Sequence, residues 1–328
     1  MELFDTPLQT NKLLFKNRLV MPPMATAKCE DDGSINEEIL QYYDEKTANG
    51  KIALVIVEHA FVLNQGRARQ KQISMAEDDK IAGAKRLCDI LHKNGTLCCM
   101  QINHAGSSAD AAASHMPVVG PSDVADVRSG TVPAAMTEEQ IREVVDAFAA
   151  AAARVRAAGC DAVEIHSAHG YLLNQFYSPY TNRRTDAYGG DIAGRIRLHL
   201  EVVRAVRKAV GEAYPIFLRL GAKDYVVEGS TVEDGIFAAK ALERAGVDLL
   251  DITGGIGGYT NPQSTAPGFF ADASAAIKKA VSIPVLVTGG VRKKADGETL
   301  LRSGAGDLIG VGRAMLQDSH WVEREWGA

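Results

Sequence analysis

The chain has 328 residues, of which 46% are hydrophobic and 23% charged, and its formal net charge is -5. This composition predicts a globular protein with a large hydrophobic core. The negative balance and the lack of a long Lys/Arg block argue against a nucleic-acid surface. No apolar run approaches the roughly 20 residues of a membrane helix, so no membrane partner is predicted.

The first ten residues carry acidic groups and no apolar stretch of the kind found in secretory signals, so we expect a cytoplasmic protein. Five cysteines are present, an odd number, and they lie mostly in apolar segments: Cys29, Cys88, Cys98, Cys99 and Cys160. No CxxC pair occurs. We therefore expect reduced core thiols, without a disulfide framework and without a cysteine-ligated zinc or iron–sulfur site.

Apolar, β-rich segments alternate with helical patterns along the chain. The predicted strands are 18–24, 52–57, 96–102, 162–165, 216–220, 249–252, 284–287 and 307–311. The predicted helices are 36–48, 77–93, 138–157, 192–210, 232–245, 271–280 and 296–302, with a last helix from 314 onward. Nearly continuous apolar strands indicate burial on both faces, as in a parallel sheet.

Eight such units in about 300 residues favour an α/β fold of the (β/α)8 TIM-barrel type. No linker or break in composition indicates a second domain, so residues 1–328 are predicted to form one domain. The segment 3–15, before the first barrel strand, is predicted to be a hairpin that caps the bottom of the barrel.

Two histidines and a tyrosine follow the fourth predicted strand: His166, His169 and Tyr171. Imidazole and phenol groups can hold a carbonyl or oxyanion, and the phenol can also supply a proton. HxxH spacing beside Glu164 is also typical of metal sites. We expect Glu164 to face away from the histidines, however, and no third ligand is apparent, so no metal is predicted.

Further polar groups stand at the carboxyl ends of the predicted strands, where a barrel places its chemistry. They are Glu58 and His59 after strand 2, Gln101 and His104 at strand 3, and Arg219 in strand 5. Arg219 lies in an apolar strand and needs an anionic or polar partner.

Glycine-rich turns follow the seventh and eighth predicted strands, as Gly289-Gly290 and Gly312-Arg313. Such turns expose backbone N–H groups, and a guanidinium can fork onto phosphate oxygens. Each pair alone could be a tight turn, but together they predict a site for a phosphorylated ligand or cofactor. No GxGxxG follows an early strand, so a Rossmann nicotinamide domain is not indicated.

These segments resemble the Old Yellow Enzyme family of FMN-dependent ene-reductases from end to end. The matching segments are LFKNRLVMPPM (14–24), QINHAG (101–106), GCDAVEIHSAHGYLLNQFYSPYTNRRTDAYGG (159–190), and VTGGV with GAGDLIGVGR between 287 and 313. The resemblance implies an FMN-binding barrel that is reduced by NADPH or NADH and reduces the activated C=C bond of an α,β-unsaturated carbonyl compound.

The resemblance also implies roles for particular residues. FMN would be held by Pro22, Pro23, Met24, Ala25, Thr26, His59, Gln101, Arg219, Gly289, Gly290, Gly312 and Arg313, with Arg219 near flavin N1 and O2 and Arg313 at the phosphate. His166 and His169 would hold the substrate carbonyl. Flavin N5 would deliver hydride to the β-carbon, and Tyr171 would protonate the α-carbon.

The chain departs from the family pattern at two positions. Some members carry threonine or cysteine beside the flavin C4 carbonyl, where Ala25 stands here with Thr26 adjacent, and one subgroup has a tyrosine near the position of Ala27. The substrate and the oligomeric state therefore do not carry over, although a homo-oligomer is compatible with the resemblance.

The sequence leaves two other functions open. One is a barrel flavoprotein with slow turnover and a binding or sensing role. The other is a phosphate-binding barrel lyase or aldolase, which usually needs a lysine for a Schiff base, and Lys223 is the one candidate at a strand end.

Overall fold

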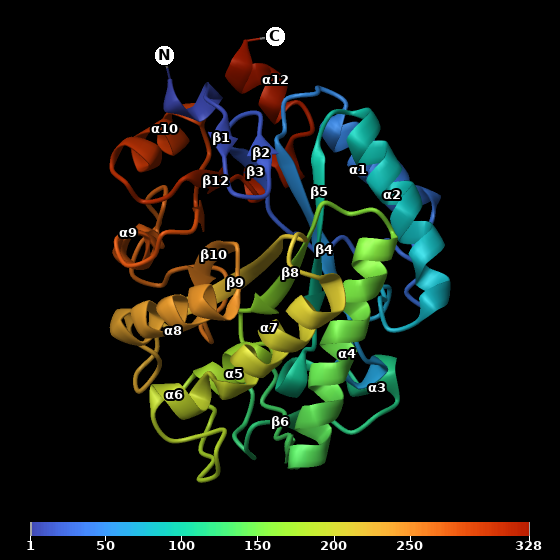
Figure 1. Cartoon of the computed structure of the whole chain (residues 1–328), viewed down its shortest axis with the longest axis vertical. Coiled ribbons are helices and arrows are strands. Elements are labelled where there is room, and N and C mark those ends of the chain that lie inside the picture. The colour runs from blue at the N-terminus through green and yellow to red at the C-terminus, as the bar shows by residue number, and fades with distance from the viewer. Residues whose placement is uncertain (1, 328) are drawn as a thin grey trace.

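The structure, a computed structural model that describes residues 2–327, contains a closed barrel of parallel strands in the order β10-β11-β12-β3-β4-β5-β8-β9 (Figure 1). The barrel strands are β3 (Leu19–Met21), β4 (Leu54–Phe61), β5 (Leu97–Asn103), β8 (Ala162–Ser167), β9 (Ile216–Lys223), β10 (Leu249–Gly254), β11 (Val285–Thr288) and β12 (Leu308–Gly310). The predicted TIM-barrel fold is confirmed.

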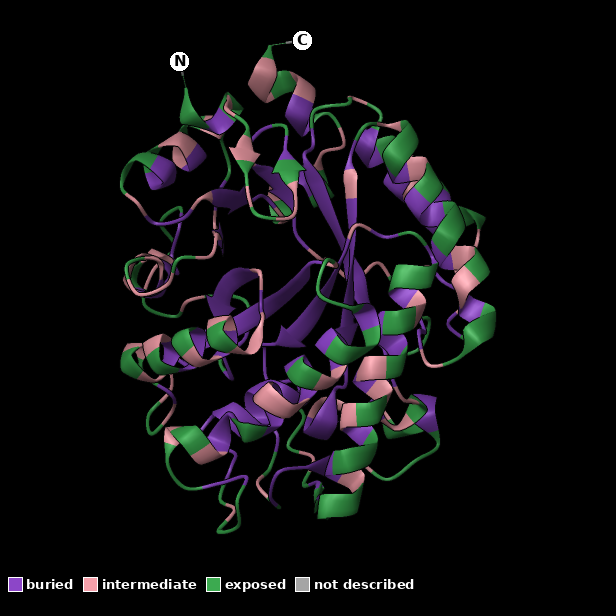
Figure 2. Cartoon of the chain, viewed as in Figure 1, coloured by how far each residue is buried: buried purple, intermediate pink, exposed green. Residues whose placement is uncertain are grey.

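Helices lie between the strands and cover the outside of the barrel. The longer ones are α1 (Glu37–Thr47), α2 (Ile81–Lys93), α4 (Glu138–Ala157), α7 (Arg197–Val210), α8 (Val232–Ala245), α9 (Ala271–Lys278) and α10 (Lys294–Arg302). Shorter ones are α3 (Ala111–Ser114), α5 (Leu172–Tyr177), α6 (Ile192–Arg195), α11 (Arg313–Gln317) and α12 (Trp321–Trp326). The strands are buried, while the helices carry buried and exposed residues on different faces (Figure 2).

The helices α4 and α8 have the bounds that the sequence predicts, because Thr137 and Thr231 form capping boxes at their N-termini. The strand predicted at 18–24 ends at Met21 instead. Pro22 and Pro23 have no backbone N–H to donate, so the ladder of hydrogen bonds stops before them. The helix predicted at 192–210 is divided at Ile196 into α6 and α7.

The predicted N-terminal hairpin is present as β1 (Leu8–Gln9) and β2 (Leu14–Phe15), which pair antiparallel. Phe15 is fully buried, and it belongs to an interior apolar cluster with Val20, Leu54 and other inward residues of the strands. Leu8 and Leu13 pack against the same cluster. The hairpin therefore caps the bottom of the barrel, as predicted.

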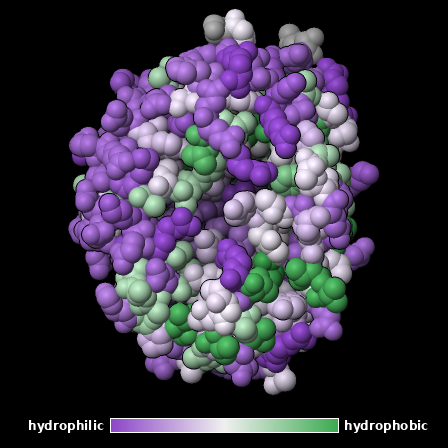
Figure 3. All heavy atoms as spheres, turned by 180° about the vertical axis from the view of Figure 1, so that it is seen from behind, coloured by the Kyte–Doolittle hydropathy of each residue, from purple (hydrophilic) through white to green (hydrophobic). Residues whose placement is uncertain are grey.

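Among residues 2–327, no helix is long and apolar enough to cross a membrane. The face seen from behind is mostly hydrophilic, with hydrophobic residues gathered on its lower part, and it is hollowed near its centre (Figure 3).

Candidate active site

A layer of polar side chains lies inside the barrel, next to a layer of apolar side chains that we call the apolar plug. Side chains of a strand alternate between faces, so residues two apart point the same way. The apolar plug contains Cys99, Ala162, Phe217, Leu249 and Leu286. Two residues further along the same strands come Gln101, Glu164, Arg219, Asp251 and Thr288, which we call the polar layer.

The polar layer is held by contacts between neighbouring strands. Gln101 Nε2 donates to Glu164 Oε1 at 2.7 Å, and these residues are register partners in β5 and β8. Arg219 Nε lies 3.0 Å from Asp251 Oδ2, again between register partners. Thr288 Oγ1 donates to Asp251 Oδ1 at 3.3 Å. The layer is therefore positioned by the register of the barrel strands themselves.

Burial decides the charges of this layer. It raises the pKa of Glu164 well above its ordinary value, and the Asp251 carboxylate adds to the effect. Burial also raises the pKa of Asp251 to about 6, opposed by the Arg219 guanidinium. The Arg219 guanidinium is thus the cation that lies beside two carboxyl groups in this layer.

The structure adds a partner for Arg219 and corrects one expectation about this layer. Arg219 pairs with the buried carboxylate of Asp251, and its predicted place beside a flavin stays a prediction. Glu164 was expected to face away from the histidines. It lies two residues before His166 on β8, where strand alternation gives both side chains the same face.

Four aromatic or imidazole rings converge at the carboxyl ends of β4 and β8, and we call them the rim group: His59, His166, His169 and Tyr171. Ring centroids are 5.2 Å apart for His166 and His169, and 5.1 Å apart for His166 and Tyr171. His59 lies 5.3 Å from Tyr171 and 6.1 Å from His166. The structure thus brings the three predicted catalytic residues together and adds His59 beside them.

The turn after β8 is shaped to deliver His169 to this group. His169 has a φ of 58°, in the left-handed region that non-glycine residues seldom adopt. Its Nε2 contacts Thr253 Oγ1 at 2.9 Å, and its backbone N–H donates to the Gly254 carbonyl at 3.3 Å. Contacts to β10 thus hold His169 in a conformation that costs free energy, as is common at functional sites.

Hydrogen bonds fix the tautomer of His59. The Gln72 side-chain Nε2 donates to His59 Nδ1 at 2.9 Å and to the His59 carbonyl at 3.0 Å. The Gln72 Oε1 accepts from the Ala68 N–H at 2.7 Å, which sets the orientation of the amide. Nδ1 of His59 is therefore an acceptor, and the ring proton lies on Nε2.

The three histidines of the rim group are neutral near pH 7. Burial lowers the pKa of His59 to about 3, and it lowers the pKa values of His166 and His169 well below their ordinary value. His169 and the Arg219 guanidinium lower the pKa of His166 further. Neutral imidazoles can donate a hydrogen bond through one N–H without bringing a positive charge.

The segment predicted to contact the flavin ring follows β3, and Pro22 is buried while residues 23–26 are half-buried. Thr26 is tied to Glu58, because its backbone N–H donates to one carboxylate oxygen at 2.8 Å and its hydroxyl to the other at 2.6 Å. The Thr26 hydroxyl is thus engaged by the Glu58 carboxylate.

The turns predicted for phosphate follow β11 and β12. Gly289 and Gly290 have positive φ values of 141° and 70°, and a Cβ on Gly290 would lie 2.7 Å from the Phe269 ring. Gly312 precedes α11, which begins at Arg313. The exposed Arg313 guanidinium lies 5.8 Å from the centroid of the Phe269 ring. Gly290 therefore cannot carry a side chain without displacing Phe269.

Sequence reasoning missed Asp251, Thr253 and Thr288. The signal that could have found them is strand parity, because each has the same parity along its strand as an inward residue of the apolar plug, Leu249 in β10 or Leu286 in β11. Asp251 is opposite Arg219, and a polar residue at a position where apolar residues are the rule indicates a partner in the interior.

The sequence pattern of the NADH:flavin oxidoreductase / NADH oxidase family matches residues 2–325. The chain belongs to this family. The NADH oxidase of Thermoanaerobacter brockii is 38% identical over 320 residues, which are 95% of this chain and 49% of that protein. The NADPH dehydrogenase of Halalkalibacterium halodurans is 36% identical over 307 residues, 93% of this chain and 88% of that protein.

Solved structures agree with this assignment. The Old Yellow Enzyme homologue from Zymomonas mobilis matches with a TM-score of 0.85 and 25% identity, covering 100% of this chain and 93% of that one. Morphinone reductase in complex with tetrahydroNAD matches with a TM-score of 0.84 and 25% identity, covering 99% and 90%. The resemblance to the Old Yellow Enzyme family is confirmed. The chain spans about half the length of the NADH oxidase.

FMN is the cofactor of this family, and the residues present fit it. Buried polar atoms without a partner among residues 2–327 include Glu164 Oε2, His166 Nδ1 and Arg219 Nε. Atoms of this kind are ready to bind a ligand, because leaving them unpaired costs free energy. The side-chain-free turn at Gly290 and the adjacent cation of Arg313 suit a phosphate.

Proposed function

We propose that this chain is an NAD(P)H-dependent FMN oxidoreductase that reduces the activated C=C bond of α,β-unsaturated carbonyl compounds. The observation that carries the proposal is the rim group. The ring centroid of His166 lies 5.2 Å from that of His169 and 5.1 Å from that of Tyr171. The strand next to His166 supplies the buried guanidinium of Arg219. When bound, FMN supplies the hydride, having received one from NADPH or NADH.

The imidazole pair would hold the substrate's carbonyl oxygen. Each neutral ring offers one N–H, and donors fixed in a dry site stabilise the negative charge that develops on that oxygen. His166 and His169 are both buried, and His169 is held by Thr253 and the Gly254 carbonyl. Withdrawal of electron density through the carbonyl makes the β-carbon of the alkene electrophilic.

Tyr171 would supply the proton. It is 8% exposed, and its ring lies beside His166 and His59 at the start of α5. The Arg128 guanidinium lies 5.5 Å from its ring centroid. The phenol would give its proton to the α-carbon of the substrate.

Arg219 and Arg313 would hold the cofactor at its two ends. The Arg219 Nε lies 3.0 Å from Asp251 but makes no hydrogen bond there, and a fixed cation beside the ring system would stabilise added negative charge. Arg313 would pair with the phosphate at the turns that contain Gly289, Gly290 and Gly312.

The environment of Lys223 disfavours the lyase alternative. Its ammonium lies 3.2 Å from Asp272 Oδ2 and 4.6 Å from the Tyr225 ring centroid. These partners engage the side-chain nitrogen, whereas Schiff-base chemistry needs a lysine nitrogen that is free to attack a carbonyl carbon.

The test uses the purified holoprotein under anaerobic conditions. NADPH or NADH should bleach the visible flavin spectrum, and 2-cyclohexenone should then restore it and yield cyclohexanone. Bleached protein that 2-cyclohexenone does not reoxidise would refute ene-reduction and favour the binding or sensing alternative.

A further inference from the structure

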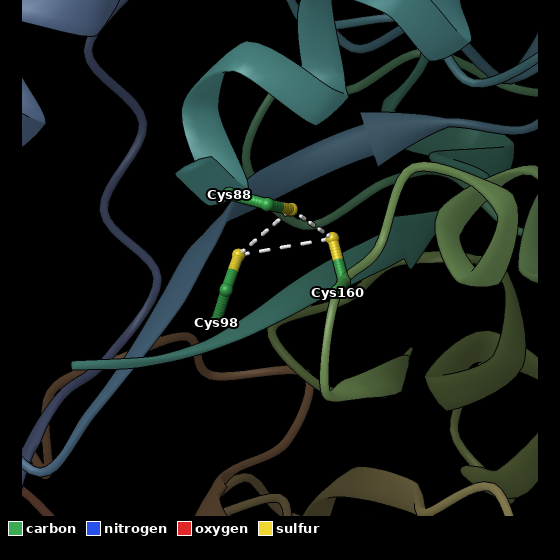
Figure 4. A group of neighbouring side chains, drawn as sticks. All are labelled: Cys88, Cys98 and Cys160. Atoms are coloured by element: carbon green, nitrogen blue, oxygen red, sulfur yellow. Dashed lines mark hydrogen bonds between the residues drawn. The ribbon is translucent and has the colours of Figure 1, made fainter. Parts of the chain in front are cut away.

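Three buried thiols meet at the end of the barrel opposite the rim group. Cys88 lies in α2, Cys98 at the start of β5, and Cys160 in the turn before β8. The Sγ–Sγ distances are 2.8 Å for Cys88–Cys160, 3.4 Å for Cys88–Cys98 and 3.7 Å for Cys98–Cys160. The three sulfur atoms point toward one another (Figure 4). Within residues 2–327, this is the one His/Cys/Asp/Glu group with the spacing of metal ligands.

The topology of the barrel creates this cluster, and the sequence spacing conceals it. The strands β5 and β8 are neighbours, and the Asp161 N–H donates to the Cys98 carbonyl at 2.8 Å, which brings Cys160 beside Cys98. Cys98 belongs to the core between strands and helices, where α2 supplies Cys88. Cys99, one residue further, belongs to the plug inside the barrel instead. The cluster is thus separate from the FMN site.

Three of the four ligands of a tetrahedrally coordinated cation could be supplied by these sulfur atoms. A cation bound to all three at about 2.3 Å, the usual Zn–S length, would lie about 1.2 Å out of the plane of the sulfurs. A regular tetrahedron at this bond length has ligand atoms about 3.8 Å apart, so Cys88 and Cys160 need to separate by about 1 Å and the other two sulfur pairs by about 0.4 Å or less. A fourth position then stays open on the far side of the ion.

His92 is a candidate for that position. It follows Cys88 by four residues on α2, and residues four apart share one face of a helix. Its Nε2 lies 2.8 Å from Asp161 Oδ2, and the same oxygen accepts from the Cys98 N–H at 2.8 Å. His92 is not among the three residues whose ligand atoms lie together in the structure, so its side chain, which is 40% exposed, would have to turn away from Asp161 to reach the ion.

We propose that Cys88, Cys98 and Cys160 form a site for a thiophilic divalent cation of the Zn(II) type, with His92 as the fourth ligand. Each metal–sulfur bond replaces an S–H bond, the thiol protons leave to water, and no oxidation occurs. Thiolate and imidazole are ligands of tetrahedral structural zinc sites. The ion would cross-link α2, β5 and the turn before β8. These lie at the end of the barrel opposite the active site, where residues contribute to stability and not to catalysis. This site runs against the prediction from the sequence that no cysteine-ligated metal is bound.

The test uses the holoprotein, stripped with a chelator and kept reduced with a phosphine, and Cd(II) as a spectroscopic probe for Zn(II). The difference spectrum should gain a near-ultraviolet thiolate-to-metal band that saturates at one Cd(II) per chain, and Zn(II) should compete for it. Native mass spectrometry should show one bound Cd(II). Cys98→Ala and Cys160→Ala should lose the band, and His92→Ala should keep it with at least tenfold weaker binding.

Cys29→Ala and Cys99→Ala are matched controls, because both remove a buried cysteine outside the cluster, and they should keep the band. The visible flavin spectrum reports in every variant whether the barrel has folded. If a cluster variant loses its flavin, the corresponding Cys→Ser variant replaces it. The Cd(II) titration of the wild type tests whether the metal site exists in either case. Absence of the band at one equivalent in reduced wild type, or its survival in Cys98→Ala or Cys160→Ala, would overturn the proposal.

Discussion

Replacing Arg219 with methionine would leave Asp251 as a buried carboxylate without its cation. The two groups are 3.0 Å apart, and their side chains are 5% and 0% exposed. Removing one partner of a buried ion pair typically costs about 3–5 kcal/mol. Here the carboxyl can escape by taking up a proton, which costs about 1.4 kcal/mol at pH 7, one pH unit above the pKa of about 6 that the group has beside Arg219. We therefore expect Arg219→Met to lower the free energy of unfolding at pH 7 by about 1.4 kcal/mol through the lost pairing, and the lost packing of the side chain adds to this.

The pH dependence separates this electrostatic effect from lost packing. With Arg219 present, the pKa of Asp251 is about 6. Without it, the pKa of Asp251 rises further, so the folded state holds a proton that the unfolded state has released. Stability then falls as pH rises. The difference in the free energy of unfolding between wild type and Arg219→Met should thus increase above pH 6, by up to about 1.4 kcal/mol per pH unit.

Denaturant unfolding of wild type, Arg219→Met, Asp251→Asn and the double variant at pH 6 and pH 8 measures both effects. The double variant should be more stable than Arg219→Met, because it buries no unpaired carboxylate, and a coupling energy of about 2 kcal/mol or more is expected. An Arg219→Met loss that is equal at both pH values, with no recovery in the double variant, would refute the reasoning.

Three further predictions concern the proton donor, the histidines and the phosphate. Tyr171→Phe should leave flavin reduction by NAD(P)H nearly unchanged and slow reoxidation by an enone about 10²–10⁴-fold in stopped-flow measurements; an equal loss in both half-reactions would make Tyr171 structural. Burial lowers the pKa values of His59, His104, His166, His169 and His199, so protons bind more tightly to the unfolded state, and stability should fall with pH below about 6.5. The expected loss from pH 6.5 to 5.5 is about 1 kcal/mol per histidine; a flat profile in thermal melts over that range would contradict the burial argument. Arg313→Ala should weaken FMN retention by about 1.5–3 kcal/mol in ultrafiltration assays of released flavin, and unchanged retention would remove Arg313 from the phosphate site.

Local rules were enough to predict the fold. The capping residues Thr137 and Thr231 and the alternation of apolar strands with helices are encoded within short windows of sequence. The end of β3 was missed although Pro22 and Pro23 were visible, because the apolar pattern continues through them. The short helix α5 was not foreseen, since its six residues follow a turn whose left-handed His169 depends on contacts with β10.

His166, His169 and Tyr171 could be predicted because they lie within six positions at the end of one strand, β8, so that no long-range placement is needed. The polar layer required the register between strands. Arg219 was recognised, but its partner Asp251 lies on the next strand, and only the pairing of β9 with β10 shows that the two meet. The cysteine cluster is harder to predict from the sequence, because it joins a helix, a strand and a turn that are up to 72 positions apart.

The most direct test of the carbonyl-binding role is a titration of the oxidised holoprotein with a para-substituted phenol. A phenolate oxygen held between His166 and His169, with its ring stacked on the flavin, should give a broad long-wavelength charge-transfer band that strengthens as pH rises toward the phenol's pKa. The His166→Ala/His169→Ala double variant should keep FMN and lack the band. A band that persists in this variant, or that never appears in the wild type, would contradict the account.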